Sequence, residues 1–370
     1  MIPEIPMCPE CGVPQMLTGE HLWLNNGEFV QSRRQGARLA FLECENLDPL
    51  YRIIGEIIGV PIERMVIDIT SRGLESYLAS FIPRETIDLL RSMKPGDEAL
   101  GQQCRQMLEG LNAASIMIGK INGTGRYEVK EFHYENSEKD FSRTWVYEPY
   151  SIPFVVGSLI GHNAAMLGGA REVEYHEVAF NVWEIISHPI PKPDEELKRR
   201  LPLTTFIHRD GDIELERCAS CGGPAVLANY KWHLDRGVVI SGFTQRRMAI
   251  LGPTMLDTVF EELEYELGDV IPQTVVEAQR RFVKTGFYSI EEVQDEGNIR
   301  EQFALRGLGN LKKIKMGARG VEARIDSAIL RPIIIGLIQG LFEMAFDVDS
   351  RAEWEYSPEG DLTIDITPTT

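Results

Sequence analysis

The sequence predicts an α+β fold that arises from the tandem duplication of one domain, a mixed helix and antiparallel-sheet domain. Three observations predict it. A Cys-x-x-Cys-Gly segment occurs twice, strand-like alternation is interspersed with helical periods, and the same order of elements follows each cysteine segment. We therefore expect two related halves, each opening with a zinc-knuckle hairpin.

The two cysteine segments lie at a constant offset in the sequence. The first reads Cys8-Pro-Glu-Cys11-Gly12 and the second reads Cys218-Ala-Ser-Cys221-Gly222. Residues that match are 210 positions apart, and the same offset relates Pro14 to Pro224, Leu17 to Leu227, Leu24 to Leu234 and Gly27 to Gly237. We predict a first copy at residues 1–195, a linker at 196–212 and a second copy at 213–370.

A second set of matching residues lies later in each copy, at a shorter offset. Pro153, Gly157 and Gly161 recur as Pro332, Gly336 and Gly340, which are 179 positions further on. The smaller offset implies that the first copy holds extra residues. We locate this insertion near residues 96–110, which have no counterpart in the second copy.

Local patterns give the elements of the first copy. Asn25-Asn26-Gly27 between apolar residues predicts a hairpin turn, because asparagine and glycine tolerate positive φ. Helical periods cover residues 47–58, 83–93 and 152–167, while strand alternation covers 115–134, 141–147 and 173–187. The first knuckle thus leads into a hairpin, as in half of a zinc ribbon.

The second copy repeats this plan. A helical period covers residues 256–267, a strand is expected at 324–330, and an apolar helix follows from Pro332. One or two strands are expected over 353–366, around a turn at 357–361.

Composition narrows the functional classes. The chain has 370 residues, enough for two domains, and a net charge of −18, which argues against a broad nucleic-acid or anionic-membrane surface. The basic stretch from Lys312 to Arg324 is interpreted as a solvated strand face. No apolar run is long enough to cross a membrane, so we expect no membrane insertion and no nucleic-acid partner. The lack of a signal-peptide pattern and the paired cysteines predict a cytoplasmic protein with reduced thiols.

The sharpest candidate site is a metal site formed by Cys8, Cys11, Cys218 and Cys221. A structural zinc takes four such thiolates, so the two knuckles complete one site if they meet. Alternatively, each knuckle has its own further ligands, with His21 and His233 as the nearest imidazoles. The four cysteines are also compatible with an iron–sulfur cluster, with redox-active pairs or with thiols that bind no metal. Cys-Pro-x-Cys-Gly before a hairpin is typical of zinc ribbons, so we predict structural zinc.

Other chemistry-bearing residues have a structural interpretation. Cys44 and Cys104 are expected to be buried thiols, and His162 a histidine satisfied in the core. Asp48 and Asp257 each follow a leucine at a predicted helix start, where a carboxylate favours the helix dipole, so we predict that they cap these helices and are not catalytic. The tryptophans are expected to be core residues rather than the lining of an aromatic cavity: Trp23, Trp145, Trp183, Trp232 and Trp354.

The later part of each copy resembles the 4-vinyl reductase family of small-molecule-binding domains. The resemblance is carried by Val321-Glu-Ala-Arg-Ile325, Pro332-x-x-x-Gly336-x-x-x-Gly340-Leu341-Phe342-Glu343, Trp354-Glu-Tyr and Asp361-Leu-Thr-Ile-Asp-Ile366, with a weaker version from Trp145 to Glu184. It implies an α+β domain with an apolar pocket, like the aromatic-sensing domains of xylene and phenol regulators and proteins linked to chlorophyll biosynthesis. The family often has metal-binding cysteines near its C-terminal end, whereas the last cysteine here is Cys221. The ATPase and DNA-binding segments of those regulators are absent from this sequence.

We therefore expect a cytoplasmic, non-catalytic protein that holds structural zinc and binds a small apolar or aromatic molecule as a sensor, carrier or accessory subunit. No nucleophile, base and orienting residue can be assembled from motif spacing, which favours a protein that is not an enzyme. One alternative is an enzyme component of an anaerobic aromatic or lipid pathway, with residues 96–110 as a lid. Another is a scaffold subunit of a larger complex, and protein partners or a homodimer are compatible with either.

Overall fold

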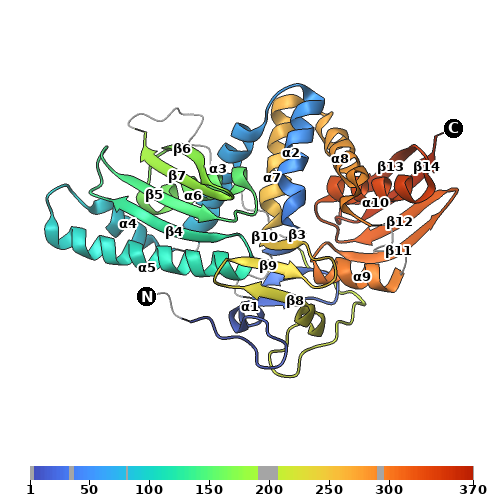
Figure 1. Ribbon diagram of the computed structural model, residues 1–370, viewed down its shortest axis with the longest axis horizontal. Helices are drawn as coiled ribbons and strands as arrows, with labels where there is room; N and C mark the ends of the chain where they lie inside the picture. Colours follow the sequence, from blue (N-terminus) through green and yellow to red (C-terminus); the bar gives the residue numbers. More distant parts are fainter. Residues whose placement is uncertain (1–3, 33–36, 81, 191–206, 290–295, 370) are drawn as a thin grey trace. The chain divides into compact units, whose positions relative to one another are not determined.

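The computed structural model describes residues 4–32, 37–80, 82–190, 207–289 and 296–369 (Figure 1). The chain forms two compact units. Unit 1 comprises Met1–Glu4, Glu63–Leu203 and Lys231–Ala249, and unit 2 comprises Ile5–Ile62, Thr204–Tyr230 and Ile250–Thr370. Both combine helices with antiparallel strands, which confirms the predicted α+β class. The units do not coincide with the two sequence halves.

Unit 1 is built on a four-stranded antiparallel sheet in the order β4-β5-β7-β6. Its elements are α3 (Glu63–Ala79), α4 (Arg84–Ser92), α5 (Glu98–Asn122), β4 (Arg126–His133), β5 (Phe141–Tyr147), α6 (Ile152–Leu167), β6 (Arg171–Ala179) and β7 (Val182–Pro189). It also contains β9 (Val238–Ser241) and most of β8 (Tyr230–His233) and β10 (Arg247–Leu251).

Unit 2 has a second four-stranded antiparallel sheet, in the order β11-β12-β14-β13. Its N-terminal elements are α1 (Gln15–Glu20), β1 (His21–Trp23), β2 (Phe29–Gln31), β3 (Arg38–Glu43) and α2 (Cys44–Ile58). Its later elements are η2 (Ala225–Asn229), α7 (Pro253–Leu267), α8 (Ile271–Phe282), η3 (Val283–Phe287), α9 (Glu296–Leu305), β11 (Asn310–Gly317), β12 (Gly320–Asp326), α10 (Arg331–Phe346), β13 (Ser350–Tyr356) and β14 (Leu362–Pro368).

Each unit combines the four-stranded sheet of one predicted copy with the hairpin of the other. In unit 2 the turn glycine Gly27 lies against β11, where an added Cβ would be 2.4 Å from the Gly309 carbonyl oxygen. In unit 1 the matching Gly237 lies against the start of β4, where a Cβ would be 2.1 Å from the Gly125 carbonyl oxygen. Both glycines have positive φ, +75° and +66°. Glycine is therefore required twice over, by the turn and by the close approach.

The recurrent glycines of the apolar helices serve helix packing. In unit 1, α6 packs on α3, and a Cβ on Gly161 would lie 2.4 Å from the Ser71 carbonyl oxygen. In unit 2, α10 packs on α8, and a Cβ on Gly336 would lie 2.4 Å from the Val276 carbonyl oxygen. Because glycine has no side chain, the backbones of the two helices in each pair can lie in direct contact.

The predicted insertion belongs to a packed helix. Residues 98–110 form the first half of α5, and Cys104 and Leu108 are buried there. They join a cluster that continues into α4, β4 and α6, formed by Leu90, Met93, Cys104, Leu108, Tyr134, Met166 and Leu167. The burial of Cys104 agrees with its predicted structural role.

Two predicted strands needed correction. Residues 115–122 are the end of α5, which starts at the Asp97 side chain cap and ends at Gly123 with φ +75°. Its isoleucines resemble a strand pattern, but the two caps make one continuous helix. The strand expected at 324–330 ends at Asp326, because Ser327 and Leu330 adopt positive φ. The helices expected at 47–58, 83–93, 152–167 and 256–267 are present.

Part of the predicted linker at 196–212 lies outside the described residues. The described part, residues 207–212, belongs to unit 2 and contacts its four-stranded sheet. Arg209 pairs with Asp361, while Asp212 accepts hydrogen bonds from Asn310 and Lys312. The chain before the second knuckle is therefore fixed to the second sheet. No helix in the described ranges is both long and apolar enough to cross a membrane.

Gly161→Ala should test the helix packing. We expect the free energy of unfolding to fall by about 1–3 kcal/mol, because the new methyl group collides with backbone of α3. Gly110→Ala in α5 is the matched control, since nothing lies within 4 Å of its Cβ position. That change should be neutral or stabilise by up to about 1 kcal/mol. If Gly161→Ala and Gly110→Ala changed the free energy of unfolding in urea by the same amount, the close packing of α6 on α3 would be contradicted.

Candidate metal centre

The two knuckles have the same backbone geometry. The Gly12 amide donates to the Cys8 carbonyl and the Gly222 amide donates to the Cys218 carbonyl, both at 2.9 Å. The two glycines have φ of +70° and +71°, a left-handed conformation that closes a tight turn. This turn brings the two cysteines of each knuckle to the same side.

The four predicted cysteines come together within unit 2. The Cys8 and Cys218 sulfurs are 3.8 Å apart, and the Cys11 and Cys221 sulfurs are 3.5 Å apart. All four sulfurs lie within 4.8 Å of one another. A tetrahedral zinc with Zn–S bonds of about 2.3 Å separates its sulfurs by about 3.8 Å. The cluster therefore has the dimensions of a single-ion site.

The cluster favours a shared site over independent knuckles. Within the described ranges it groups four cysteines and no histidine. The His21 ring lies near other atoms: its Nδ1 is 2.8 Å from the Leu17 carbonyl oxygen, and the ring lies 5.5 Å from that of Phe29. Four thiols already complete a tetrahedral set.

Hydrogen bonds and burial act differently on the two thiols of the first knuckle. The backbone amide of Cys11, with that of Glu10, lowers the pKa of the Cys8 thiol to about 7. Burial raises the pKa of the Cys11 thiol. Only the thiolate is a metal ligand, so a bound cation would displace the remaining protons.

A side-chain contact joins the two knuckles directly. Glu10 Oε2 accepts hydrogen bonds from the Ser220 amide at 3.0 Å and the Ser220 hydroxyl at 2.7 Å. Glu10 and Ser220 occupy the same place in their knuckles, 210 positions apart. The sequence analysis did not predict this contact. The matching positions of Glu10 and Ser220 indicate a contact only if the two knuckles are already known to lie side by side.

Other candidate residues occupy structural positions. Cys44 is buried at the start of α2. His162 lies 2.9 Å from Asn112 Oδ1, and burial lowers its pKa to about 4, so the imidazole is neutral at pH 7. Both agree with the predicted core roles. Of the five tryptophans, Trp23 is buried as predicted, whereas the other four are partly exposed, so the prediction that all five are core residues was wrong.

The prediction that Asp48 and Asp257 cap their own helices was wrong. Each is the fifth residue of its helix, in α2 and α7. The Asp257 carboxylate instead accepts a hydrogen bond from the Leu330 amide, where α10 begins. Leu330 has φ +50°, which is strained for a residue with a side chain. Burial raises the pKa of Asp257 to about 7, although Arg331 and Arg38 lower it.

Asp257→Asn should change how stability depends on pH. The folded-state pKa lies above the unfolded value, so the native state retains a proton that the unfolded chain releases between pH 4 and 7. This group therefore lowers the free energy of unfolding as pH rises through that range. The variant should gain about 3–4 kcal/mol relative to wild type between pH 4 and 8, because the two pKa values differ by about three units. Asp269→Asn, at an exposed position, is the control. If the free energy of unfolding changed with pH in the same way for wild type and Asp257→Asn, the raised pKa of Asp257 would be contradicted.

Glu343, from the family-like segment, has a structural role. It accepts hydrogen bonds from Arg280 Nε at 3.0 Å, Lys284 Nζ at 2.8 Å and the Ser350 amide at 2.9 Å. Burial alone would raise its pKa, but these donors lower it. The carboxylate is fully partnered and ties α10 to α8 and β13.

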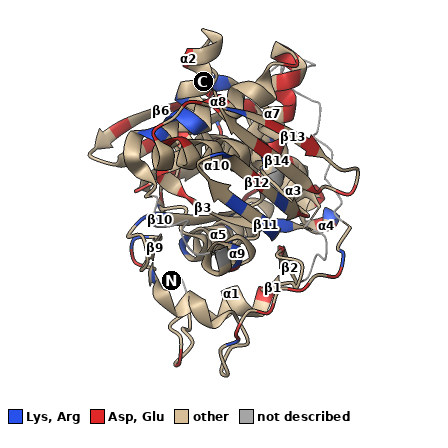
Figure 2. Cartoon of the chain, turned by 90° about the vertical axis from the view of Figure 1, so that its right-hand side faces the viewer, with Lys and Arg blue, Asp and Glu red and all other residues tan. Residues whose placement is uncertain are grey.

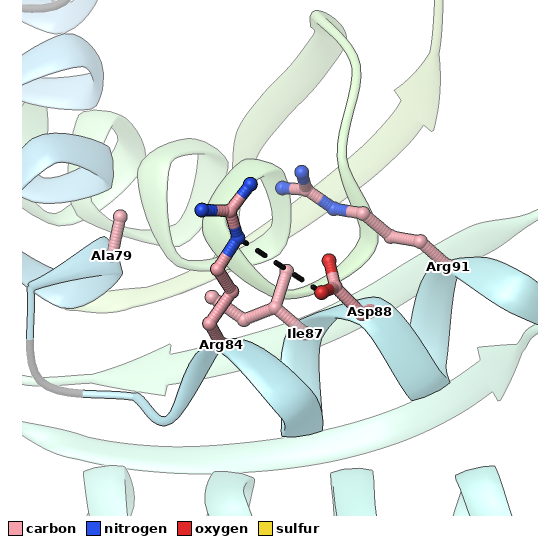
Figure 3. Close-up of a pocket in the computed structure, with 5 residues that line it drawn as sticks. All are labelled: Ala79, Arg84, Ile87, Asp88 and Arg91. Carbon is pink, nitrogen blue, oxygen red and sulfur yellow. Dashed lines mark ion pairs between the residues drawn. The ribbon is translucent and has the colours of Figure 1, made fainter.

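One cavity of unit 1 has a polar lining. It measures about 400 Å³ and is lined by Ala79, Arg84, Ile87, Asp88 and Arg91. Figure 3 shows the Arg84 and Arg91 side chains extending over the same hollow, with an ion pair joining Arg84 to Asp88. The Arg84 side chain is 92% exposed. This open, charged hollow differs from the apolar pocket that the family resemblance implies.

Comparisons with known proteins assign no family. No family model matches the chain. The phosphatidylinositol-3,5-bisphosphate 3-phosphatase MTMR2 of Gallus gallus is 26% identical over 158 residues. That stretch covers 40% of this chain and 25% of the relative, so the chain spans a quarter of that protein's length.

Among solved structures, weak likenesses are found to H-NOX proteins. An I5F mutant of the T. tengcongensis H-NOX and a Cs H-NOX mutant carrying 4-cyano-L-phenylalanine each have 13% identity and a TM-score of 0.24. Each match covers 32% of this chain and 75% of the neighbour. A TM-score this low establishes no common fold.

Proposed function

We propose that this chain is a zinc protein, in which one structural Zn²⁺ is held by Cys8, Cys11, Cys218 and Cys221. The observation that carries the proposal is the group of four sulfurs within 4.8 Å of one another. Four thiolates with no open position are typical of structural zinc, whereas catalytic zinc keeps a water position. A reducing compartment such as the cytoplasm would keep these thiols available.

Zinc fits the site better than an iron–sulfur cluster. In a four-iron cluster each cysteine binds a different iron, so the sulfurs lie further apart than around one ion. The separations of 3.5 and 3.8 Å correspond to edges of a tetrahedron around a single atom. A redox Cys-x-x-Cys pair would open a helix, whereas Cys11 and Cys221 are each followed by a left-handed glycine turn.

The proposed ion would hold distant parts of unit 2 together. Its ligands come from a segment that precedes β1 and from one that follows the linker region, 210 residues later. Closing so long a loop is entropically costly, and a metal that binds only the folded chain stabilises that arrangement. Zinc would thus be required for stability.

Metal analysis of wild type and Cys218→Ser tests the proposal. We expect one zinc per chain in wild type and less than a tenth of that in the variant, whose melting temperature should fall by several degrees, because a tetrahedral site loses a ligand. Cys104→Ala, which removes a buried thiol elsewhere, is the control and should retain the full zinc content. Metal-free wild type, or zinc retained in Cys218→Ser, would contradict the proposal.

A second candidate function is the binding of a small apolar molecule, which the family resemblance implies. Gln279 of α8 supports it, because the residue is fully buried and neither its Nε2 nor its Oε1 has a partner among the described residues. Buried Asn46 of α2, a helix that packs against α8, also has an unpartnered Oδ1. Unpaired buried amides are costly and call for a missing partner. We propose that they anchor the polar end of an otherwise apolar ligand.

Mass spectrometry of solvent extracts from purified protein tests this second function. We expect one small apolar compound from wild type and at least about tenfold less from Gln279→Met, which removes the polar anchor. Gln339→Met is the control: Gln339 is buried in α10, but its amide already donates to Ser350, so ligand should remain. An empty wild type, or equal amounts from wild type and Gln279→Met, would contradict ligand binding.

A further inference from the structure

The four cysteines of the metal centre differ in how far solvent reaches them. Cys8 and Cys218 are buried, with exposed fractions of 2% and 4%, whereas Cys221 is partly exposed. Nothing lies within 4 Å of a Cβ position on Gly222, the residue that follows Cys221. Ser220, at the tip of the same knuckle, is exposed. A small dissolved molecule can therefore reach the Cys221 sulfur.

A second sulfur lies beside this exposed one. The Cys11 sulfur of the first knuckle is 3.5 Å from the Cys221 sulfur of the second knuckle. The two atoms are in contact, so a disulfide bond between them needs only a small movement of the side chains. Around a bound zinc all four sulfurs are thiolates, so their exposure decides which one an oxidant attacks first. Cys221 is thus placed to be oxidised, and Cys11 to react with the oxidised sulfur.

Protein contacts hold the two knuckles side by side without the help of a metal ion. Glu10 of the first knuckle accepts hydrogen bonds from the amide and the hydroxyl of Ser220 in the second. Arg217, which precedes the second knuckle, donates to the Trp23 carbonyl at 2.7 Å. These contacts do not involve the sulfur atoms, so they can persist while the sulfurs react. Cysteines of different knuckles therefore stay close enough to pair.

The charge near the cysteines favours an uncharged oxidant. The chain has a net charge of −18, and Figure 2 marks its acidic residues in red. Four exposed glutamates lie within four positions of a cysteine of the centre in the sequence: Glu4, Glu10, Glu214 and Glu216. A negatively charged oxidant is repelled by such a field, whereas hydrogen peroxide is neutral at pH 7. Peroxide is therefore the oxidant that suits this site.

We propose that Cys221 and Cys11 are a peroxide-sensitive pair, and that their oxidation to a disulfide between the knuckles releases the zinc ion. This inference rests on the shared zinc site of the proposed function. First, the Cys221 thiolate attacks a peroxide oxygen: an S–O bond forms, the O–O bond breaks and hydroxide leaves. The Cys11 thiolate then attacks the sulfur of this sulfenic acid: an S–S bond forms, the S–O bond breaks and a second hydroxide leaves. Two solvent protons convert the hydroxides to water, so the two thiolates supply the two electrons that reduce one peroxide.

The products of this reaction explain why zinc would leave. Cys8 and Cys218 are the two ligands that remain, and two thiolates do not complete a tetrahedral site. The new disulfide joins residues 210 positions apart, so a covalent bond replaces the ion as the connection between the two segments. Disulfides within each knuckle, between Cys8 and Cys11 or between Cys218 and Cys221, would give no such connection. The pairing of the cysteines therefore distinguishes this reaction from that of a redox Cys-x-x-Cys motif.

Treatment of zinc-loaded wild type with hydrogen peroxide tests the proposal. We expect release of about one zinc per chain, measured with a chromogenic chelator, and consumption of about one peroxide per zinc. After alkylation in denaturant and digestion with trypsin, tandem mass spectrometry should find peptide 1–33 linked to peptide 218–231 through Cys11 and Cys221. Cys44 and Cys104 are buried elsewhere in the chain and serve as internal controls, since both should remain reduced. The variant Cys104→Ala should release the same amount of zinc as wild type.

A second measurement identifies the sulfur that reacts first. Dimedone, which traps sulfenic acids, should label Cys221 at least about tenfold more than Cys8 or Cys218 during brief exposure to peroxide, because those two thiolates are buried. Wild type that holds no zinc before treatment would overturn the proposed function, and this inference with it. Wild type that holds zinc and retains it in peroxide would overturn the inference alone. So would disulfides formed within each knuckle, or label chiefly on Cys8 or Cys218.

Discussion

The meeting of the two knuckles is the contact on which the rest of unit 2 depends. It brings the sulfur atoms of cysteines 210 residues apart to within 3.5 and 3.8 Å of each other. The protein contacts around the site are arranged accordingly. Arg217, next to the second knuckle, donates to the Trp23 carbonyl of β1 at 2.7 Å, and Glu10 binds Ser220 across the knuckles. The two segments are thus aligned by protein contacts, and a metal ion would complete the connection.

The pairing of each sheet with the hairpin of the other predicted copy explains two of the recurrent glycines, Gly27 and Gly237. Gly27 and Gly237 approach the backbone of a strand that belongs to the other copy, while Gly161 and Gly336 approach a helix of their own copy. A side chain at any of these positions would meet backbone atoms that cannot yield. Each knuckle is followed by three short strands, then helices, two strands, an apolar helix and two more strands. The pairing of sheet and hairpin also accounts for compact units that differ from the sequence halves.

Local patterns predicted much of the fold, and the offset predicted the cysteine cluster. Helical periodicity predicted α2, α6 and α7, because a helix with one buried face has apolar residues every three to four positions. The extent of α5 was missed, because isoleucine-rich helix and strand look alike over short stretches. Glu10 with Ser220, and Asp257 with Leu330, could not be foreseen. Each pair joins distant elements, and periodicity reports only on a single element.

X-ray absorption spectroscopy at the zinc K-edge, on wild-type protein purified without added metal, examines the shared site most directly. A single shell of four sulfur atoms at about 2.3 Å is expected, because all four thiolates would bind one ion. Nitrogen or oxygen neighbours would mean that each knuckle binds its own metal with other ligands. An iron edge in place of zinc, or no metal signal, would contradict a structural zinc shared by Cys8, Cys11, Cys218 and Cys221.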